Sequence, residues 1–146
     1  RRSPARLHSK ALSLFSLYQL QGRPLGERGL ALFGRYREAL RARNLADFDD
    51  LITLTEQLIR TNEAAARELR SRWDYLLVDE FQDLNPAQYA IVRGLAEMHR
   101  NLFGVGDDEQ SIFSWTGSDP RILSQFRDDF GLAGPIVPGQ QLLIPA

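Results

Sequence analysis

The sequence predicts an α/β protein in which a helical N-terminal segment precedes part of a parallel β-sheet. First, apolar side chains over residues 1–72 recur at the spacing of helix faces. Second, two short apolar runs, 75–78 and 102–106, are each followed by acidic residues. Third, a helical pattern separates these runs, and a strand, a helix and a strand over about 30 residues indicate a right-handed βαβ unit with parallel strands.

Four helices are expected in the N-terminal segment. The Gly/Pro-rich stretch 22–26 ends the first helix, and a second is expected at about 27–43. Asp47 is suited to cap a third, because its carboxylate accepts a hydrogen bond from a free amide at the helix start. A fourth, polar helix is expected over 63–70.

The character of the chain changes at Trp73. The run 75–78 is apolar throughout, which is typical of a strand buried on both faces of a parallel sheet. Asn85 and Pro86 then predict a helix start, because Asn caps helices and Pro at the first position loses no needed amide bond. The acidic residues after both strands are therefore expected at one edge of the sheet, where open α/β sheets bind ligands.

Composition narrows the possible classes of protein. The absence of Cys excludes disulfides and thiolate metal sites, and no apolar run reaches the ~18 residues of a membrane span. With no signal peptide and no initiating Met, we expect an internal piece of a longer cytoplasmic protein. Residues 1–72 carry 14 basic and 8 acidic groups, whereas residues 73–146 carry 4 and 11. The basic half is suited to nucleic acid, although two solvated surfaces of opposite sign explain the charges more simply.

Two acidic clusters have residue types that suit nucleotide chemistry. A carboxylate fixed at a strand end, as expected for Asp79, is a ligand for Mg²⁺, and Glu80 is placed to activate a water. In the second cluster, Gly106 permits a turn, and Gln110 suits a terminal phosphate or its attacking water. An exposed Trp115 would stack on a base, although a lone Trp is more often a core residue.

Three blocks of sequence together resemble the UvrD/Rep/PcrA-like superfamily 1 DNA helicases. Residues 79–85 with Gln88 resemble motif II, and residues 105–113 resemble motif III. Residues 44–51 resemble the segment that precedes motif II in that family. The resemblance extends over residues 36–130, and the order of the three blocks makes it far more specific than a lone acidic pair.

The resemblance implies a partial RecA-like fold of the P-loop NTPase class. Residues 1–72 would be part of the inserted helical subdomain and its connection, residues 73–130 part of the RecA-like ATPase domain, and residues 131–146 an irregular tail. The implied parent enzyme is a helicase that uses ATP and Mg²⁺ to move 3′ to 5′ along single-stranded DNA.

The resemblance also implies roles at the ATP site. Asp79 corresponds to the Mg²⁺ ligand, and Glu80 to the general base that activates water against the γ-phosphate. Gln82 and Asp83 complete this ATP-binding motif and couple it to neighbouring loops. Gln110 corresponds to the catalytic glutamine that senses the γ-phosphate.

The implied DNA contacts lie in the second block. Trp115 corresponds to the aromatic residue on which a DNA base stacks, and Phe113 stands near the DNA where the family usually has Tyr. Thr116 and Ser114 replace arginines that are usual or frequent in the family, which weakens the expected grip on DNA.

The sequence contains no G-x-x-x-x-G-K-[ST] phosphate loop, so we expect this segment alone not to hydrolyse ATP. In addition, residues 135–141 replace the family's next motif. One alternative is therefore a degenerate, non-catalytic DNA- or protein-binding module. Another is a metal-dependent nuclease or phosphatase built on four carboxylates, which the lack of a placed His disfavours. Those four residues are Asp79, Glu80, Asp107 and Asp108.

Overall fold

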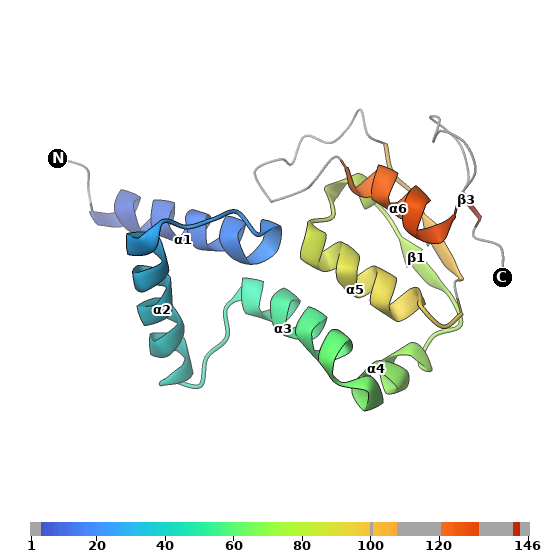
Figure 1. Ribbon diagram of the computed structural model, residues 1–146, viewed down its shortest axis with the longest axis horizontal. Helices are drawn as coiled ribbons and strands as arrows, with labels where there is room; N and C mark the ends of the chain where they lie inside the picture. Colours follow the sequence, from blue (N-terminus) through green and yellow to red (C-terminus); the bar gives the residue numbers. More distant parts are fainter. Residues whose placement is uncertain (1–3, 100, 108–120, 132–141, 144–146) are drawn as a thin grey trace. The chain divides into compact units, whose positions relative to one another are not determined.

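The computed structural model describes residues 4–99, 101–107, 121–131 and 142–143 (Figure 1). It contains helices and a small sheet in which two strands are parallel, in agreement with the predicted α/β class. The chain divides into two compact units, residues 1–55 and 56–146, which are described in turn. The assignment of residues 1–72, 73–130 and 131–146 to parts of a helicase stays a prediction.

The first unit consists of helices packed through aromatic rings. Phe15 is buried, and its ring centroid lies 5.2 Å from that of Phe33 and 5.4 Å from that of Tyr36. These rings join the first two helices, which are separated at Gly22 in a left-handed conformation with φ of 67°. The elements of this unit are α1 (Pro4–Gln21), α2 (Glu27–Arg41) and the beginning of α3 (Phe48–Thr61).

The start of α3 is fixed by a reciprocal pair of aspartates. Asp47 caps the helix as predicted, because its Oδ1 accepts the backbone N–H of Asp50 at 2.7 Å. The N–H of Asp47 donates to Oδ2 of Asp50 at 3.3 Å. Two α2 side chains hold this pair: the Tyr36 hydroxyl donates to Oδ2 of Asp47 at 2.7 Å, and Arg37 forms an ion pair with the buried Asp50. The aspartates that resemble a family segment therefore have a structural role here.

We expect Tyr36 to ionise later than a free tyrosine. Burial and the hydrogen bond to Asp47 raise the pKa of Tyr36 to about 12, above the ordinary 10.0. Its contribution to the free energy of unfolding is therefore complete below pH 10 and is lost as the pH rises towards 12. The difference in phenolate absorbance between the wild type and Tyr36→Phe isolates this ring. Asp47→Asn should lower the midpoint of the titration, and an unchanged midpoint would contradict the assigned hydrogen bond.

The second unit contains a βαβ arrangement extended by a third strand. β1 and β2 are parallel, with Leu76 opposite Leu102, and β3 pairs with β2 in the antiparallel direction. β3 lies in the stretch that the sequence predicted to be irregular. The elements after α3 are α4 (Glu63–Arg70), β1 (Leu76–Val78), the 3-10 helix η1 (Phe81–Asp83), α5 (Pro86–Ala96), β2 (Leu102–Gly104), α6 (Ile122–Phe130) and β3 (Leu142–Leu143).

Helix starts in this unit follow the sequence signals. The side chain of Asn85 accepts the N–H of Gln88 at 2.9 Å, and the side chain of Gln88 accepts the N–H of Asn85 at 3.0 Å. This is a capping box, with Pro86 in the first turn of α5, so the predicted start is confirmed. Asn62 caps α4 through a single bond, because its side chain accepts the N–H of Ala65 at 3.0 Å.

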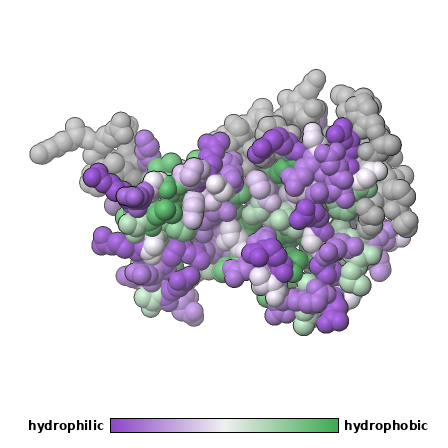
Figure 2. Space-filling view, in the orientation of Figure 1, coloured by the Kyte–Doolittle hydropathy of each residue, from purple (hydrophilic) through white to green (hydrophobic). Residues whose placement is uncertain are grey.

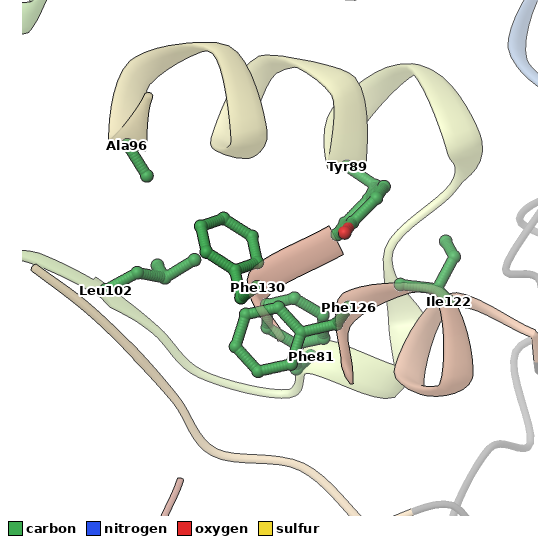
Figure 3. Close-up of a cluster of buried hydrophobic side chains, with 7 residues drawn as sticks. All are labelled: Phe81, Tyr89, Ala96, Leu102, Ile122, Phe126 and Phe130. Atoms are coloured by element: carbon green, nitrogen blue, oxygen red, sulfur yellow. The ribbon is translucent and has the colours of Figure 1, made fainter. Parts of the chain in front are cut away.

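A cluster of buried side chains lies between the sheet and the helices α5 and α6 (Figure 3). The rings of Phe81 and Phe126 lie with centroids 4.8 Å apart, and Phe126 contacts Phe130 at 5.1 Å. The Tyr89 hydroxyl donates to Oδ2 of Asp129 at 2.8 Å. Burial and this hydrogen bond raise the pKa of Tyr89 above its ordinary value. The cluster consists of Phe81, Tyr89, Ala96, Leu102, Ile122, Phe126 and Phe130.

β1 is not buried on both faces, so that prediction is wrong. Leu76 and Val78 pack against the core cluster, whereas Leu77 is 76% exposed. Successive side chains of a strand point to opposite faces, and α5 and α6 both contribute to the cluster beneath Leu76 and Val78. Among the described residues, the face that carries Leu77 is not covered as the face that carries Leu76 and Val78 is. Elsewhere, hydrophilic side chains cover most of the surface seen in Figure 2, with hydrophobic residues showing between them.

The two faces of the sheet should respond differently to truncation. Leu102→Ala should lower the free energy of unfolding by about 2–4 kcal/mol, because the residue is buried in the core cluster. Leu77→Ala should change it by only about 0.5 kcal/mol, because most of that side chain is already in water. Urea unfolding of the two variants checks the comparison. Equal losses would show that the face carrying Leu77 is covered in solution.

Candidate functional site

The candidate site begins at the carboxyl end of β1, where the chain makes a tight turn. Asp79 and Glu80 are exposed, and Glu80 adopts the left-handed conformation, with φ of 50° and ψ of 47°. Few residues other than glycine adopt this conformation. The turn directs Phe81 into the core, and the Phe81 N–H donates to the Val105 carbonyl at 2.8 Å. The packing of Phe81 therefore places the two carboxylates at the edge of the sheet.

The loops after the two parallel strands meet at this edge, as the sequence predicted. The N–H of Val105 donates to the Val78 carbonyl at 2.8 Å, which continues the strand pairing beyond β2. The N–H of Asp107 then donates to Oε1 of Gln82 at 2.9 Å. A buried side chain of the first acidic cluster is thus bonded to the backbone of the second.

Gln82 also contacts the candidate base. Its Nε2 donates to Oε2 of Glu80 at 2.6 Å, and the Gln82 residue is only 3% exposed. One side-chain amide therefore joins the Glu80 carboxylate to the backbone at Asp107. The sequence did not reveal this contact, because it joins residues 25 positions apart through one rotamer of a long side chain.

Two glycines make room for these side chains. A Cβ on Gly104 would lie 2.9 Å from Cδ2 of Phe81, and a Cβ on Gly106 would lie 2.6 Å from Oε1 of Gln82. The sequence predicted that Gly106 permits a turn. Its φ lies outside the left-handed region, so the observed need for glycine comes from the close approach of Gln82.

Asp79 and Asp83 differ in their surroundings. Asp79 is exposed, and its Oδ1 accepts the N–H of Glu80 at 3.0 Å. Asp83 is half-buried in η1, and its Oδ1 has no hydrogen-bond partner among the described residues. Within those same residues, no group of three or more acidic or histidine side chains gathers to hold a metal ion. An exposed carboxylate at a strand end, such as that of Asp79, is of a kind that binds Mg²⁺ together with substrate phosphates.

The remaining predicted site residues lie outside the described part of the chain. They are Gln110, Phe113 and Trp115, together with Asp108, Ser114 and Thr116. Of the residues predicted from the sequence, the structure brings Glu80 and Gln82 into contact and places Asp79 beside them. It places Asp83 in η1, immediately after Gln82.

A separate hollow of about 660 Å³ is lined by residues of α3, α4, α5 and α6, and the strand-end carboxylates do not line it. Its arginines already have acidic partners: Arg60 pairs with Glu56 at 2.8 Å, and Arg70 pairs with Glu97. Arg93 pairs with Asp129 at 3.3 Å. None of the described residues that the sequence predicts for the ATP site lines this hollow.

Residues 5–131 match the UvrD/REP helicase N-terminal domain. The chain belongs to the UvrD/Rep helicase family. It is 45% identical over 102 residues to the ATP-dependent DNA helicase Rep of Escherichia coli (strain K12), a match that covers 67% of the chain and 15% of that relative. Its identity to Rep of Buchnera aphidicola subsp. Schizaphis graminum is 39% over 113 residues, covering 77% and 17%.

A third relative is the DNA helicase II of Rickettsia typhi, with 36% identity over 107 residues, covering 73% of the chain and 16% of the relative. The chain thus spans between 15% and 17% of the length of these three relatives. The family predicted from the three blocks of sequence is confirmed. The assignment of these blocks to motifs II and III stays a prediction. None of the described helices has the length and apolar character needed to cross a membrane.

Proposed function

We propose that the chain is part of an ATP-dependent DNA helicase, and that it supplies the acidic edge of the ATP site. The observation that carries the proposal is the placement of Asp79 and Glu80 at the end of a parallel strand, in a family whose named relatives are ATP-dependent DNA helicases. In this proposal, residues 79–85 are motif II and residues 105–113 are motif III of a RecA-like fold. The parent protein moves 3′ to 5′ along single-stranded DNA in the cytoplasm.

Asp79 is the proposed ligand of Mg²⁺. This ion commonly retains waters and binds through one or two carboxylates together with substrate phosphates, which fits an exposed carboxylate at a strand end. When bound with ATP, Mg²⁺ neutralises negative charge on the phosphates. The chain's own contribution is to fix Asp79 through β1 and through the bond from the Glu80 N–H to Oδ1.

Glu80 is the proposed general base. Its carboxylate is exposed to solvent, where a water molecule can reach it, and it accepts a hydrogen bond from Gln82. Gln82 and Asp83 belong to the same ATP-binding segment, and Gln110 is the proposed sensor of the γ-phosphate. Trp115 and Phe113 are the proposed contacts to DNA bases, because both correspond to aromatic positions of the family pattern.

The second candidate function is a non-catalytic module that binds DNA or protein. The basic half of the chain, residues 1–72, and Trp115 favour it. Thr116 and Ser114 disfavour it, because they replace arginines that help DNA binding in the family pattern. In either case this segment alone, which contains no phosphate loop, is expected not to hydrolyse ATP.

The decisive experiment measures ATP hydrolysis by a full-length protein that contains this segment, with and without single-stranded DNA. Glu80→Gln should lower the DNA-stimulated kcat by about 100-fold or more, because a general base contributes on that order. Glu68→Gln on the exposed face of α4 is a matched control and should leave kcat unchanged. Binding of DNA by a folded wild-type protein without any hydrolysis would instead support the non-catalytic module.

A further inference from the structure

We propose that Gln82 is a positioning residue that holds the carboxylate of Glu80 in place from the loop following β2. This inference rests on the proposed function, because it assigns a role to the contact between Gln82 and Glu80, the proposed general base. The contact has two ends. Nε2 of Gln82 donates to Oε2 of Glu80 at 2.6 Å, and Oε1 of Gln82 accepts the N–H of Asp107 at 2.9 Å.

The chemistry of the two partners fixes the orientation of the Gln82 amide. A backbone N–H can only donate, so the amide oxygen of Gln82 faces Asp107. An ionised carboxylate can only accept, so the amide nitrogen faces Glu80. A flipped amide would place its oxygen against a carboxylate and its N–H₂ against an N–H, which loses both bonds. Gln82 is therefore held in one orientation by both neighbours together.

The burial of Gln82 allows its amide to restrict the Glu80 side chain. Gln82 is 3% exposed, so water does not compete at its amide, whereas Glu80 is an exposed residue with several rotatable bonds. Without Gln82, the Glu80 side chain would sample several rotamers. With it, one carboxylate oxygen is held and the other is left for a water molecule. Restricting a catalytic group in this way is what raises the fraction of productive encounters.

The same arrangement makes the position of Glu80 depend on the second loop. Gly106 lets that loop approach Gln82, since a Cβ there would lie 2.6 Å from Oε1. Any displacement of the backbone at Asp107 therefore moves or releases the Gln82 amide and, through it, the Glu80 carboxylate. The loop that follows β2 thereby gains a physical connection to the proposed base.

Two substitutions separate the two ends of the contact. Gln82→Glu retains an acceptor for the Asp107 N–H but replaces the donor to Glu80 with a second carboxylate. Gln82→Met retains the length of the side chain and removes both bonds. In the full-length protein, both variants should lower the DNA-stimulated kcat roughly 10- to 100-fold, because a small misplacement of a catalytic group has an effect of that size. The Kd for ADP, measured by fluorescence of a labelled nucleotide, should change less than about twofold, since a positioning residue leaves uniform binding intact.

A double-mutant cycle tests whether Gln82 acts through Glu80. In the Glu80→Gln background, Gln82→Met should cause no further loss of kcat, because the group it positions has already been removed. If the two losses multiply instead, Gln82 acts independently and the inference is wrong. It is also wrong if Gln82→Glu keeps the wild-type kcat, because bonding to Asp107 would then be its whole role.

A variant of Gly106 tests the contact without changing Gln82 or Glu80. Gly106→Ala should displace the Gln82 amide and lower kcat in the same range as Gln82→Met. Gly34→Ala is the matched control, because no atom lies within 4 Å of a Cβ built there. Wild-type kcat in Gly106→Ala would contradict the close contact with Gln82.

Hydrogen exchange at the Asp107 amide gives a measurement that does not require activity. Gln82→Met should speed this exchange about tenfold, an amount typical of losing one hydrogen bond, while the Val105 amide, bonded to the Val78 carbonyl, should stay protected. Unchanged exchange at Asp107 would overturn this inference and leave the proposed function standing. A wild-type protein that hydrolyses no ATP would overturn the proposed function and this inference together. Normal wild-type hydrolysis with unaffected Gln82 variants would overturn only the inference.

Discussion

The buried ring of Phe81 determines where the acidic edge of the sheet lies. It packs between Phe126 and Tyr89, with ring centroids 4.8 and 6.1 Å away, and it occupies the space that a side chain on Gly104 would take. Burying a Phe side chain contributes about 1.5–3 kcal/mol, whereas a left-handed backbone costs about 1–3 kcal/mol. The two amounts are comparable, so the core can hold Glu80 in its left-handed turn. This hydrophobic contact sets the backbone position of the two acidic residues, and hydrogen bonds then orient their carboxylates.

The local features of this fold were predictable because they depend on residues close together in sequence. Asn85 with Pro86, and Asp47, marked helix starts through side-chain caps that span only a few positions. The parallel pairing of the strands was predictable because a short βαβ unit allows essentially one handedness. The meeting of the two strand-end loops follows from that pairing. The exposure of Leu77 was not predictable, because an apolar run does not reveal how many faces other elements cover.

The candidate site also contains residues that could be predicted from the sequence and a contact that could not. Asp79 and Glu80 could be singled out from residue type and position, since carboxylates at strand ends suit cations and water. The link from Gln82 to Asp107 could not be predicted, because it depends on a side-chain rotamer and on loops brought together by tertiary packing. Membership of the UvrD/Rep helicase family is established for residues 5–131. The roles of individual residues stay predictions, and those of Gln110, Phe113 and Trp115 concern positions outside the described residues.

The close approach of Gly106 to Gln82 also restricts how this site can evolve. A side chain at position 106 would displace the Gln82 amide, and a shorter residue at position 82 would lose the bonds to both Glu80 and Asp107. A substitution at either position alone is therefore expected to weaken the site, even where a change at both positions restores the packing. We therefore expect substitutions at positions 106 and 82 to have non-additive effects on the site.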